Sequence, residues 1–200
     1  MSTALLLPLT SPAGPQPHRW TAVEFNRMGD LGWFEGYRAF LLDGIVLENG
    51  PMDTPHAVAL GLVEHAIRTA FGSGWWLRGQ SPLHVDEYND PFPDCAVVPG
   101  VPRDYLAKQP TTATLVVEVS DSSPSIDITE KAECYASAGV SDYWVLDLNG
   151  RRLLVFRDPT PLPAGLGVTA YRTQLTLAAT DHVSPLAVPH ASILVNDLLP

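Results

Sequence analysis

The sequence predicts a mixed α/β fold in which one β-sheet is flanked by helices. Three observations carry this prediction. Apolar residues recur at helical spacing from Val58 to Ala70. Residues 114–119 (TLVVEV) form a nearly continuous apolar run, which is typical of a strand buried on both faces. Two dipeptides that accept positive φ, Asp43-Gly44 and Asn149-Gly150, lie between apolar runs and predict β-hairpins.

The chain begins with a proline-rich segment, residues 1–18, which has no apolar periodicity and is expected to be a disordered tail. Thr21 and Glu24 then form a capping-box pattern, in which each side chain can accept from the other's backbone N–H. A short helix is therefore predicted to run to about Met28. Residues 19–200 are expected to form one domain, because a chain of this size folds around a single apolar core.

The first hairpin and the longest helix follow. Residues 39–42 and 45–47 flank Asp43-Gly44 and are the predicted strands of the hairpin. The pair Thr54-Pro55 is typical of an N-cap followed by proline at the first helical position. The helix that it begins is predicted to end at Gly72.

Short β-like runs dominate the middle of the chain. Residues 75–99 contain three of them, WWLRG, PLHVDEY and CAVVPG. The connector 100–113 contains a predicted turn of helix at residues 104–108, and the apolar strand 114–119 follows it.

The C-terminal part alternates again between helix and strand. Asp127 and Glu130 form a second capping-box-like start, and the helix is predicted to end at Gly139. The hairpin around Asn149-Gly150 comes next, then one or two further strands and a short terminal helix near residues 193–199.

The composition sets limits on location and on partners. The 12 basic and 22 acidic side chains give a net charge of −10, which disfavours a non-specific nucleic-acid coat. Cys95 and Cys134 lack CxxC spacing, so they predict neither a disulfide framework nor a zinc knuckle and fit a reducing compartment. No apolar stretch has the length of a membrane span, and the run at residues 5–9 is too short for a signal peptide. We therefore expect a soluble, cytoplasmic protein that does not enter a membrane.

Two carboxylates are candidate metal ligands. Asp94 precedes a short apolar strand, and Glu118 lies one residue before the end of the run 115–119. If these strands are neighbours, both side chains emerge at one end of the sheet, where their oxygens would suit Mg²⁺. Asp94 alone is better explained as a residue that caps a turn after proline. Glu118 is not, because an acid in a buried strand is costly unless it is paired or metal-bound.

Lys131 and His56 complete the set of candidates. Lys131 has Ile128 and Tyr135 as helical neighbours and should therefore face the sheet. It could pair structurally with Glu118, or it could stabilise negative charge near a metal-held phosphate. His56, in the first turn of the long helix, is more commonly a surface or capping residue than a catalytic one.

Several motifs in this order resemble the Uma-two family of restriction endonucleases, within the PD-(D/E)XK nuclease superfamily. They are LLDGIVLENGPMDTPH (41–56), PDCAVV (93–98), LVVEVSDSSPSID (115–127), Lys131, and YASAGVSDYWVLD (135–147) with its following strand. The resemblance covers roughly residues 20–200 and implies a restriction-endonuclease-like α/β core.

The resemblance also implies roles for single residues. Asp94 and Glu118 would bind the metal, Lys131 would match the family's relocated lysine, and His56 would match a family histidine. Two positions depart from the pattern. Ser120 stands where the superfamily has its catalytic lysine, and Phe40 stands where relatives often carry a glutamate.

These observations lead to one principal hypothesis and two rivals. The principal hypothesis is a Mg²⁺-dependent (or Mn²⁺-dependent) endonuclease that hydrolyses phosphodiester bonds in DNA, as a homodimer if both strands are cut. Its rivals are a cleavage-incompetent binding or regulatory protein and a metal-dependent hydrolase of small phosphorylated substrates. Positive potential for DNA would come from a hairpin bearing arginines, although such residues are more often ordinary surface side chains; they are Arg151, Arg152, Arg157 and Arg172.

Overall fold

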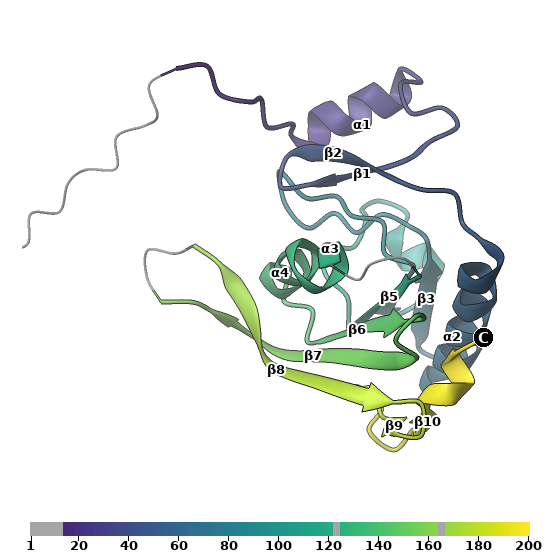
Figure 1. Cartoon of the computed structure of the whole chain (residues 1–200). Coiled ribbons are helices and arrows are strands. Elements are labelled where there is room, and N and C mark those ends of the chain that lie inside the picture. The colour runs from purple at the N-terminus through teal and green to yellow at the C-terminus, as the bar shows by residue number, and fades with distance from the viewer. Residues whose placement is uncertain (1–13, 122–124, 164–166) are drawn as a thin grey trace, which may run out of the picture.

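The computed structural model describes residues 14–121, 125–163 and 167–200 (Figure 1). Of the predicted tail 1–18, residues 1–13 lie outside the described part, and residues 14–18 are exposed and belong to no helix or strand. The predicted capping box is confirmed, because the Glu24 N–H donates to the Thr21 hydroxyl and the Thr21 N–H donates to the Glu24 carboxylate. It begins α1 (Ala22–Asp30).

The helix α1 and a two-stranded hairpin form an N-terminal layer at the top of Figure 1. The hairpin consists of β1 (Arg38–Leu42) and β2 (Ile45–Asn49), and both residues of its turn, Asp43 and Gly44, have positive φ as predicted. Its small core contains Phe25, Met28 and Leu41.

A six-stranded sheet carries the rest of the chain, in the order β3-β4-β5-β6-β7-β8. Its strands are β3 (Trp75–Gly79), β4 (Cys95–Pro99), β5 (Leu115–Ser120), β6 (Asp142–Asp147), β7 (Arg152–Pro161) and β8 (Thr169–Ala178). Neighbouring strands are antiparallel except β5 and β6, which are parallel and are connected by helix. The mixed α/β prediction is therefore confirmed.

Helices cover the two faces of this sheet (Figure 1). On one face lies α2 (Thr54–Phe71), together with β9 (His182–Val183), β10 (Ile193–Leu194) and the 3₁₀ helix η2 (Val195–Leu198). On the other lie the short helices α3 (Ser125–Ile128) and α4 (Glu130–Ser137). One more 3₁₀ helix, η1 (Pro102–Tyr105), lies between β4 and β5.

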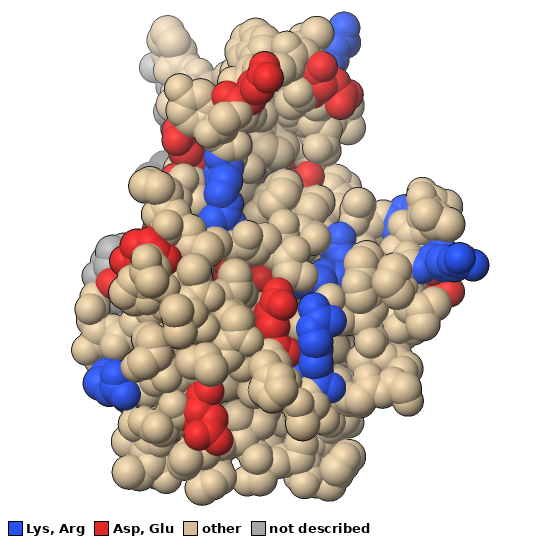
Figure 2. Space-filling view, turned by 90° about the vertical axis from the view of Figure 1, so that its right-hand side faces the viewer, with Lys and Arg blue, Asp and Glu red and all other residues tan. Residues whose placement is uncertain are grey.

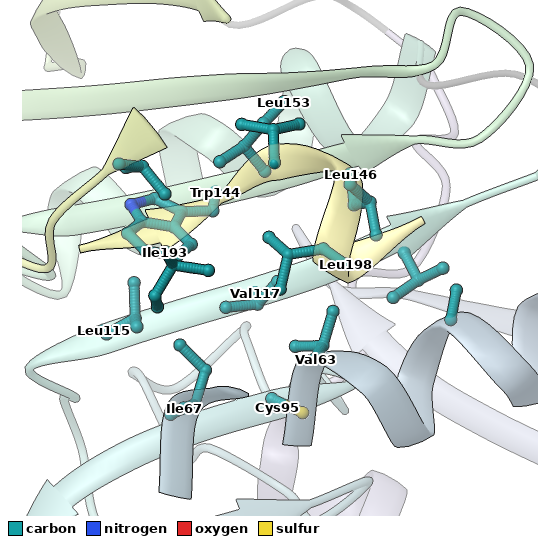
Figure 3. Close-up of a cluster of buried hydrophobic side chains, with 14 of the residues drawn as sticks. Val63, Ile67, Cys95, Leu115, Val117, Trp144, Leu146, Leu153, Ile193 and Leu198 are labelled. Carbon is teal, nitrogen blue, oxygen red and sulfur yellow. The ribbon is translucent and has the colours of Figure 1, made fainter. Parts of the chain in front are cut away.

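The side chains of β5 alternate between the two faces, and this alternation decides where its carboxylate lies. Leu115 and Val117 face α2 and the C-terminal segment, in the cluster that Figure 3 shows with Trp144 and Ile67. Val116 belongs to the opposite cluster, with Tyr135 of α4. Glu118, two residues after Val116, therefore faces α4.

Four predicted elements differ from the structure. The N-cap of α2 is Asp53, whose side chain accepts from the His56 N–H, so the helix begins one residue earlier than Thr54-Pro55 suggested. The run PLHVDEY is not a strand, because Asp86 alone among its residues makes a β-bridge, an isolated one to Asn89 just after the run. The helical turn expected at 104–108 is instead η1.

The fourth difference bears on the site. The predicted helix 127–139 is interrupted at Thr129, whose backbone (φ −116°, ψ −90°) is not helical. Asp127 consequently lies inside α3 rather than at a helix start.

The second hairpin is confirmed, but its positive φ is at Arg151 and not in Asn149-Gly150. In the described part of the chain, no helix is both long and apolar enough to cross a bilayer.

Candidate active site

Asp94 and Glu118 lie side by side on neighbouring strands. Cys95 of β4 pairs with Val117 of antiparallel β5, and the same register continued by one residue sets Asp94 opposite Glu118. Backbone groups hold the pair in place. The Val119 N–H donates to Asp94 Oδ2 at 2.9 Å, and the Asp94 N–H lies 3.4 Å from Glu118 Oε2. The expectation that both carboxylates emerge at one end of the sheet is thus met by the geometry.

Glu118 is enclosed by two residues of α4. Its Oε1 accepts a hydrogen bond from the Tyr135 hydroxyl at 2.7 Å and lies 3.2 Å from Lys131 Nζ. Lys131 and Tyr135 are four residues apart and therefore share the face of α4 that covers the sheet. This face is buried, and Glu118 is only 2% exposed.

Lys131 contacts a third carboxylate as well. Its Nζ lies 2.9 Å from Asp127 Oδ1, one helical turn earlier across the break at Thr129. It also lies 5.5 Å from the centre of the Phe40 ring, within the range of a cation–π contact. This position is compatible with both roles considered for Lys131. It pairs the ammonium group with Glu118, and it places the same group in the wall of a cavity, where it could stabilise a phosphate.

The buried charges of this cluster do not balance. One lysine faces three carboxylates, Asp94, Glu118 and Asp127, all less than 9% exposed. Burial raises the pKa of Glu118, and the charges of Asp94 and Asp127 raise it further against the opposing effect of Lys131. Burial disfavours the charge of Lys131 too, but its neighbouring carboxylates outweigh this and raise the pKa of the ammonium. The cluster therefore carries excess negative charge that a bound cation would offset.

His56 joins the cluster from the first turn of α2. Its Nε2 lies 3.2 Å from Asp94 Oδ1, and its Nδ1 lies 3.8 Å from Asp121 Oδ2. The hydrogen bond to Asp94 raises the pKa of His56 despite partial burial. Burial opposes ionisation of Asp94, but the contact with His56 and the bond from Val119 outweigh it and lower the pKa of Asp94.

A cavity of about 540 Å³ opens between the N-terminal layer, α2 and the end of β5. We call it the catalytic pocket. All four candidate residues line it, namely His56, Asp94, Glu118 and Lys131. The volume lies within the range of about 300–1,000 Å³ that ligand sites occupy.

The sequence candidates did not include Asp127, Asp121 or Arg38, which also belong to this region. Asp127 could have been found from its i,i+4 spacing to Lys131. Asp121 and Arg38 also line the pocket, but no local pattern marks them, because their position depends on how β1 and the loop after β5 meet. Arg38 is the cationic side chain of the N-terminal layer that faces this cavity.

The donor set of the pocket fits a hard divalent cation with few protein ligands. No group of three or more His, Cys, Asp or Glu side chains arranged to hold a metal occurs within the described residues. Asp94 and Glu118 nevertheless present adjacent carboxylate oxygens, and Mg²⁺ commonly binds through one or two carboxylates, water and substrate phosphate. Mn²⁺ accepts the same ligands.

The two positions that depart from the family pattern both line this pocket. Ser120 ends β5 on the same face as Glu118, and Phe40 lies below Lys131 Nζ. Lys131 therefore brings an ammonium group next to Glu118 from α4, although residue 120 is a serine.

The arginines of the second hairpin lie outside the catalytic pocket. Arg152 pairs with Asp147 and Arg157 with Asp142, each at 2.8 Å and each with a buried carboxylate. Arg151 donates to the carbonyl of Pro200. These contacts give Arg151, Arg152 and Arg157 structural partners, and substrate binding by them stays a prediction.

Comparison with known proteins supports the fold and identifies the family. A solved structure from Anabaena variabilis, described as a "putative nuclease belonging to DUF820", superposes with a TM-score of 0.62 at 13% identity, covering 80% of this chain and 88% of that one. No curated protein matches the chain. The model of the Uma2 (Uma-two) family, described as "Putative restriction endonuclease", matches residues 23–196. With this match over most of its length, and with the sheet and carboxylate pair described above, the chain belongs to the Uma2 family.

Proposed function

We propose that the chain is a metal-dependent endonuclease that hydrolyses phosphodiester bonds in DNA. The observation that carries the proposal is the pair Asp94 and Glu118, which stand together in a water-accessible cavity with excess negative charge. Family membership and a nuclease-like fold support the same reaction class.

Asp94 and Glu118 would hold Mg²⁺ or Mn²⁺, which when bound lowers the pKa of a water and polarises the scissile phosphate. The other residues position these ligands and balance charge. Tyr135 and the Val119 N–H fix the orientation of the two carboxylates. His56 holds Asp94 from the side of α2. Lys131 supplies positive charge close to the position where a phosphate would gain negative charge.

The test is cleavage of labelled DNA with millimolar Mg²⁺ or Mn²⁺. Asp94→Asn and Glu118→Gln should each lower the rate by more than about a hundredfold, because each removes a metal-binding charge. Glu133→Gln is the matched control, since Glu133 lies on α4 but is exposed. Cleavage at the wild-type rate by Glu118→Gln would show that the site is wrong.

The two rivals have observations in their favour. Ser120 and Phe40 in the pocket wall favour a protein that binds without cutting, and calorimetric titration that detects no Mg²⁺ or Mn²⁺ binding would support it. The net charge of −10 favours small phosphorylated substrates, which competition between nucleotides and oligonucleotides would reveal. A homodimer and a cytoplasmic location stay predictions from the sequence.

A further inference from the structure

A second cavity adjoins the catalytic pocket. It has a volume of about 380 Å³ and shares three wall residues with the catalytic pocket, namely Arg38, Asn49 and Phe92. We call it the aromatic pocket. Because the two cavities share a wall, one ligand can occupy both, with one part at the carboxylates and another part beyond Arg38.

The two cavities differ in charge. The catalytic pocket is lined by six acidic residues, which are Glu48, Asp53, Asp94, Glu118, Asp121 and Asp127. The described residues that line the aromatic pocket include no acid. The chain has 22 acidic and 12 basic residues, so a cavity without acidic residues is unexpected beside an acidic one. The catalytic pocket suits a cation with its phosphate, and the aromatic pocket suits an uncharged group.

Rings and carboxamides form the wall of the aromatic pocket. The rings belong to Phe25, Phe34, Tyr37 and Phe92. The carboxamides belong to Asn26, Asn49 and Gln80. This combination of side chains suits a planar ring with polar edges. The aromatic side chains can stack on its faces, and the carboxamides can donate hydrogen bonds to its edges and accept hydrogen bonds from them.

Gln80 links this wall to the proposed metal ligands. Its side-chain amide lies 3.5 Å from Asp94 Oδ1, and its backbone N–H donates to the Asp94 carbonyl at 3.0 Å. Its backbone has a positive φ of 43°, which is uncommon for a residue with a side chain and occurs where the surroundings impose it. A ring in the aromatic pocket would therefore lie beside a residue that contacts the catalytic carboxylate.

We propose that the aromatic pocket receives an unstacked nucleobase of the nucleotide adjoining the scissile phosphate, so that the preferred substrate is single-stranded or locally unpaired DNA. This inference rests on the proposed nuclease function. Arg38, in the wall common to both pockets, is placed to contact the phosphate that joins base and cleavage site. A base in a duplex cannot enter such a pocket unless it leaves the stack.

The charge of the chain supports the same substrate. Binding to duplex DNA draws its affinity mainly from many Lys and Arg contacts with phosphate. On the face in Figure 2, uncharged side chains cover most of the surface, and basic and acidic side chains are interspersed. Base stacking depends little on phosphate charge, so it can supply affinity that this surface lacks.

Fluorescence anisotropy tests the inference with a labelled 12-nucleotide DNA strand, the same strand in a duplex, and the strand with one abasic position at a time. Tyr37→Ala should weaken single-strand binding about tenfold, the loss expected when one base loses its stacking partner. Trp33→Ala is the matched control, because Trp33 is 64% exposed, as Tyr37 is 60% exposed, but does not line either pocket. It should change the affinity by less than about twofold.

Wild-type protein should prefer the single strand to the duplex, and one abasic position should remove the difference between wild type and Tyr37→Ala. Equal losses in the two variants, equal affinity for strand and duplex, or no effect of any abasic position would each overturn the inference. If the duplex is nevertheless cut at the wild-type rate by Tyr37→Ala, the proposed nuclease function stands and only the aromatic pocket is wrong. If wild type binds neither DNA, both fail.

Discussion

Replacing Lys131 by methionine tests whether this lysine offsets buried negative charge. Lys131 is 6% exposed and lies 2.9 Å from Asp127 and 3.2 Å from Glu118. Methionine keeps most of the buried volume but removes the charge. Breaking a buried pair by deleting one partner costs about 3–5 kcal/mol, because the charge that stays behind has no compensation. We expect a loss of this size in the free energy of unfolding at about pH 8.

The loss should depend on pH with a defined sign. Without Lys131, the pKa of Glu118 in the folded variant rises further above its value in the unfolded chain. At a pH between these two pKa values, the Glu118 carboxyl is protonated in the folded variant and ionised in the unfolded chain. Such a group contributes stability at low pH that disappears as the pH rises through its folded pKa. The loss in the free energy of unfolding caused by Lys131→Met should therefore shrink as the pH falls. The decrease should be about 1.4 kcal/mol for each pH unit over which the folded variant holds one more proton than the folded wild type.

Urea unfolding followed by circular dichroism at about pH 8 and about pH 5.5 measures both effects. Lys108→Met is the matched control, because Lys108 is the other lysine of the chain and is exposed. It should change the stability by less than about 0.5 kcal/mol. A loss below about 1 kcal/mol for Lys131→Met, or the same loss at both pH values, would refute the reasoning that Lys131 compensates buried carboxylates.

Two further predictions concern stability alone. Asp90 is 4% exposed, its Oδ1 has no hydrogen-bond partner among the described residues, and burial raises its pKa against the weaker effect of a hydrogen bond from Asn26. Its carboxylate therefore destabilises the fold as the pH rises, and Asp90→Asn should raise the unfolding free energy by about 1 kcal/mol near pH 8 but not near pH 4; no gain near pH 8 would contradict this. Ile67→Ala should lower the free energy of unfolding in urea by about 2–5 kcal/mol, because Ile67 of α2 is fully buried against the sheet. Val58→Ala, at an exposed position of the same helix, should cost less than about 1 kcal/mol.

Local patterns predicted the elements whose signals are local. The capping box at Thr21 and the turn Asp43-Gly44 involve residues within a few positions of one another, and both appear as expected. The break at Thr129 was missed because the sequence on both sides of it favours helix. PLHVDEY was predicted to be a strand because its apolar residues alternate. It is not one, because no neighbouring strand pairs with it and only an isolated bridge forms at Asp86.

The candidate site was predictable to a similar extent. An acid within TLVVEV is conspicuous in the sequence, and the register of β4 and β5 explains why Asp94 lies beside it. The contribution of the N-terminal layer was not predictable. Arg38 and Asn49 reach the pockets only because β1 and β2 fold over the end of the sheet, which no spacing in the sequence encodes.

The antiparallel register between β4 and β5 also has a consequence for insertions and deletions. Side chains alternate along β5, so a slip of one residue would turn Glu118 toward α2 and put a valine, Val117 or Val119, in its place beside Asp94. A residue gained or lost within β5 would thus remove the carboxylate pair while leaving composition and hydropathy almost unchanged.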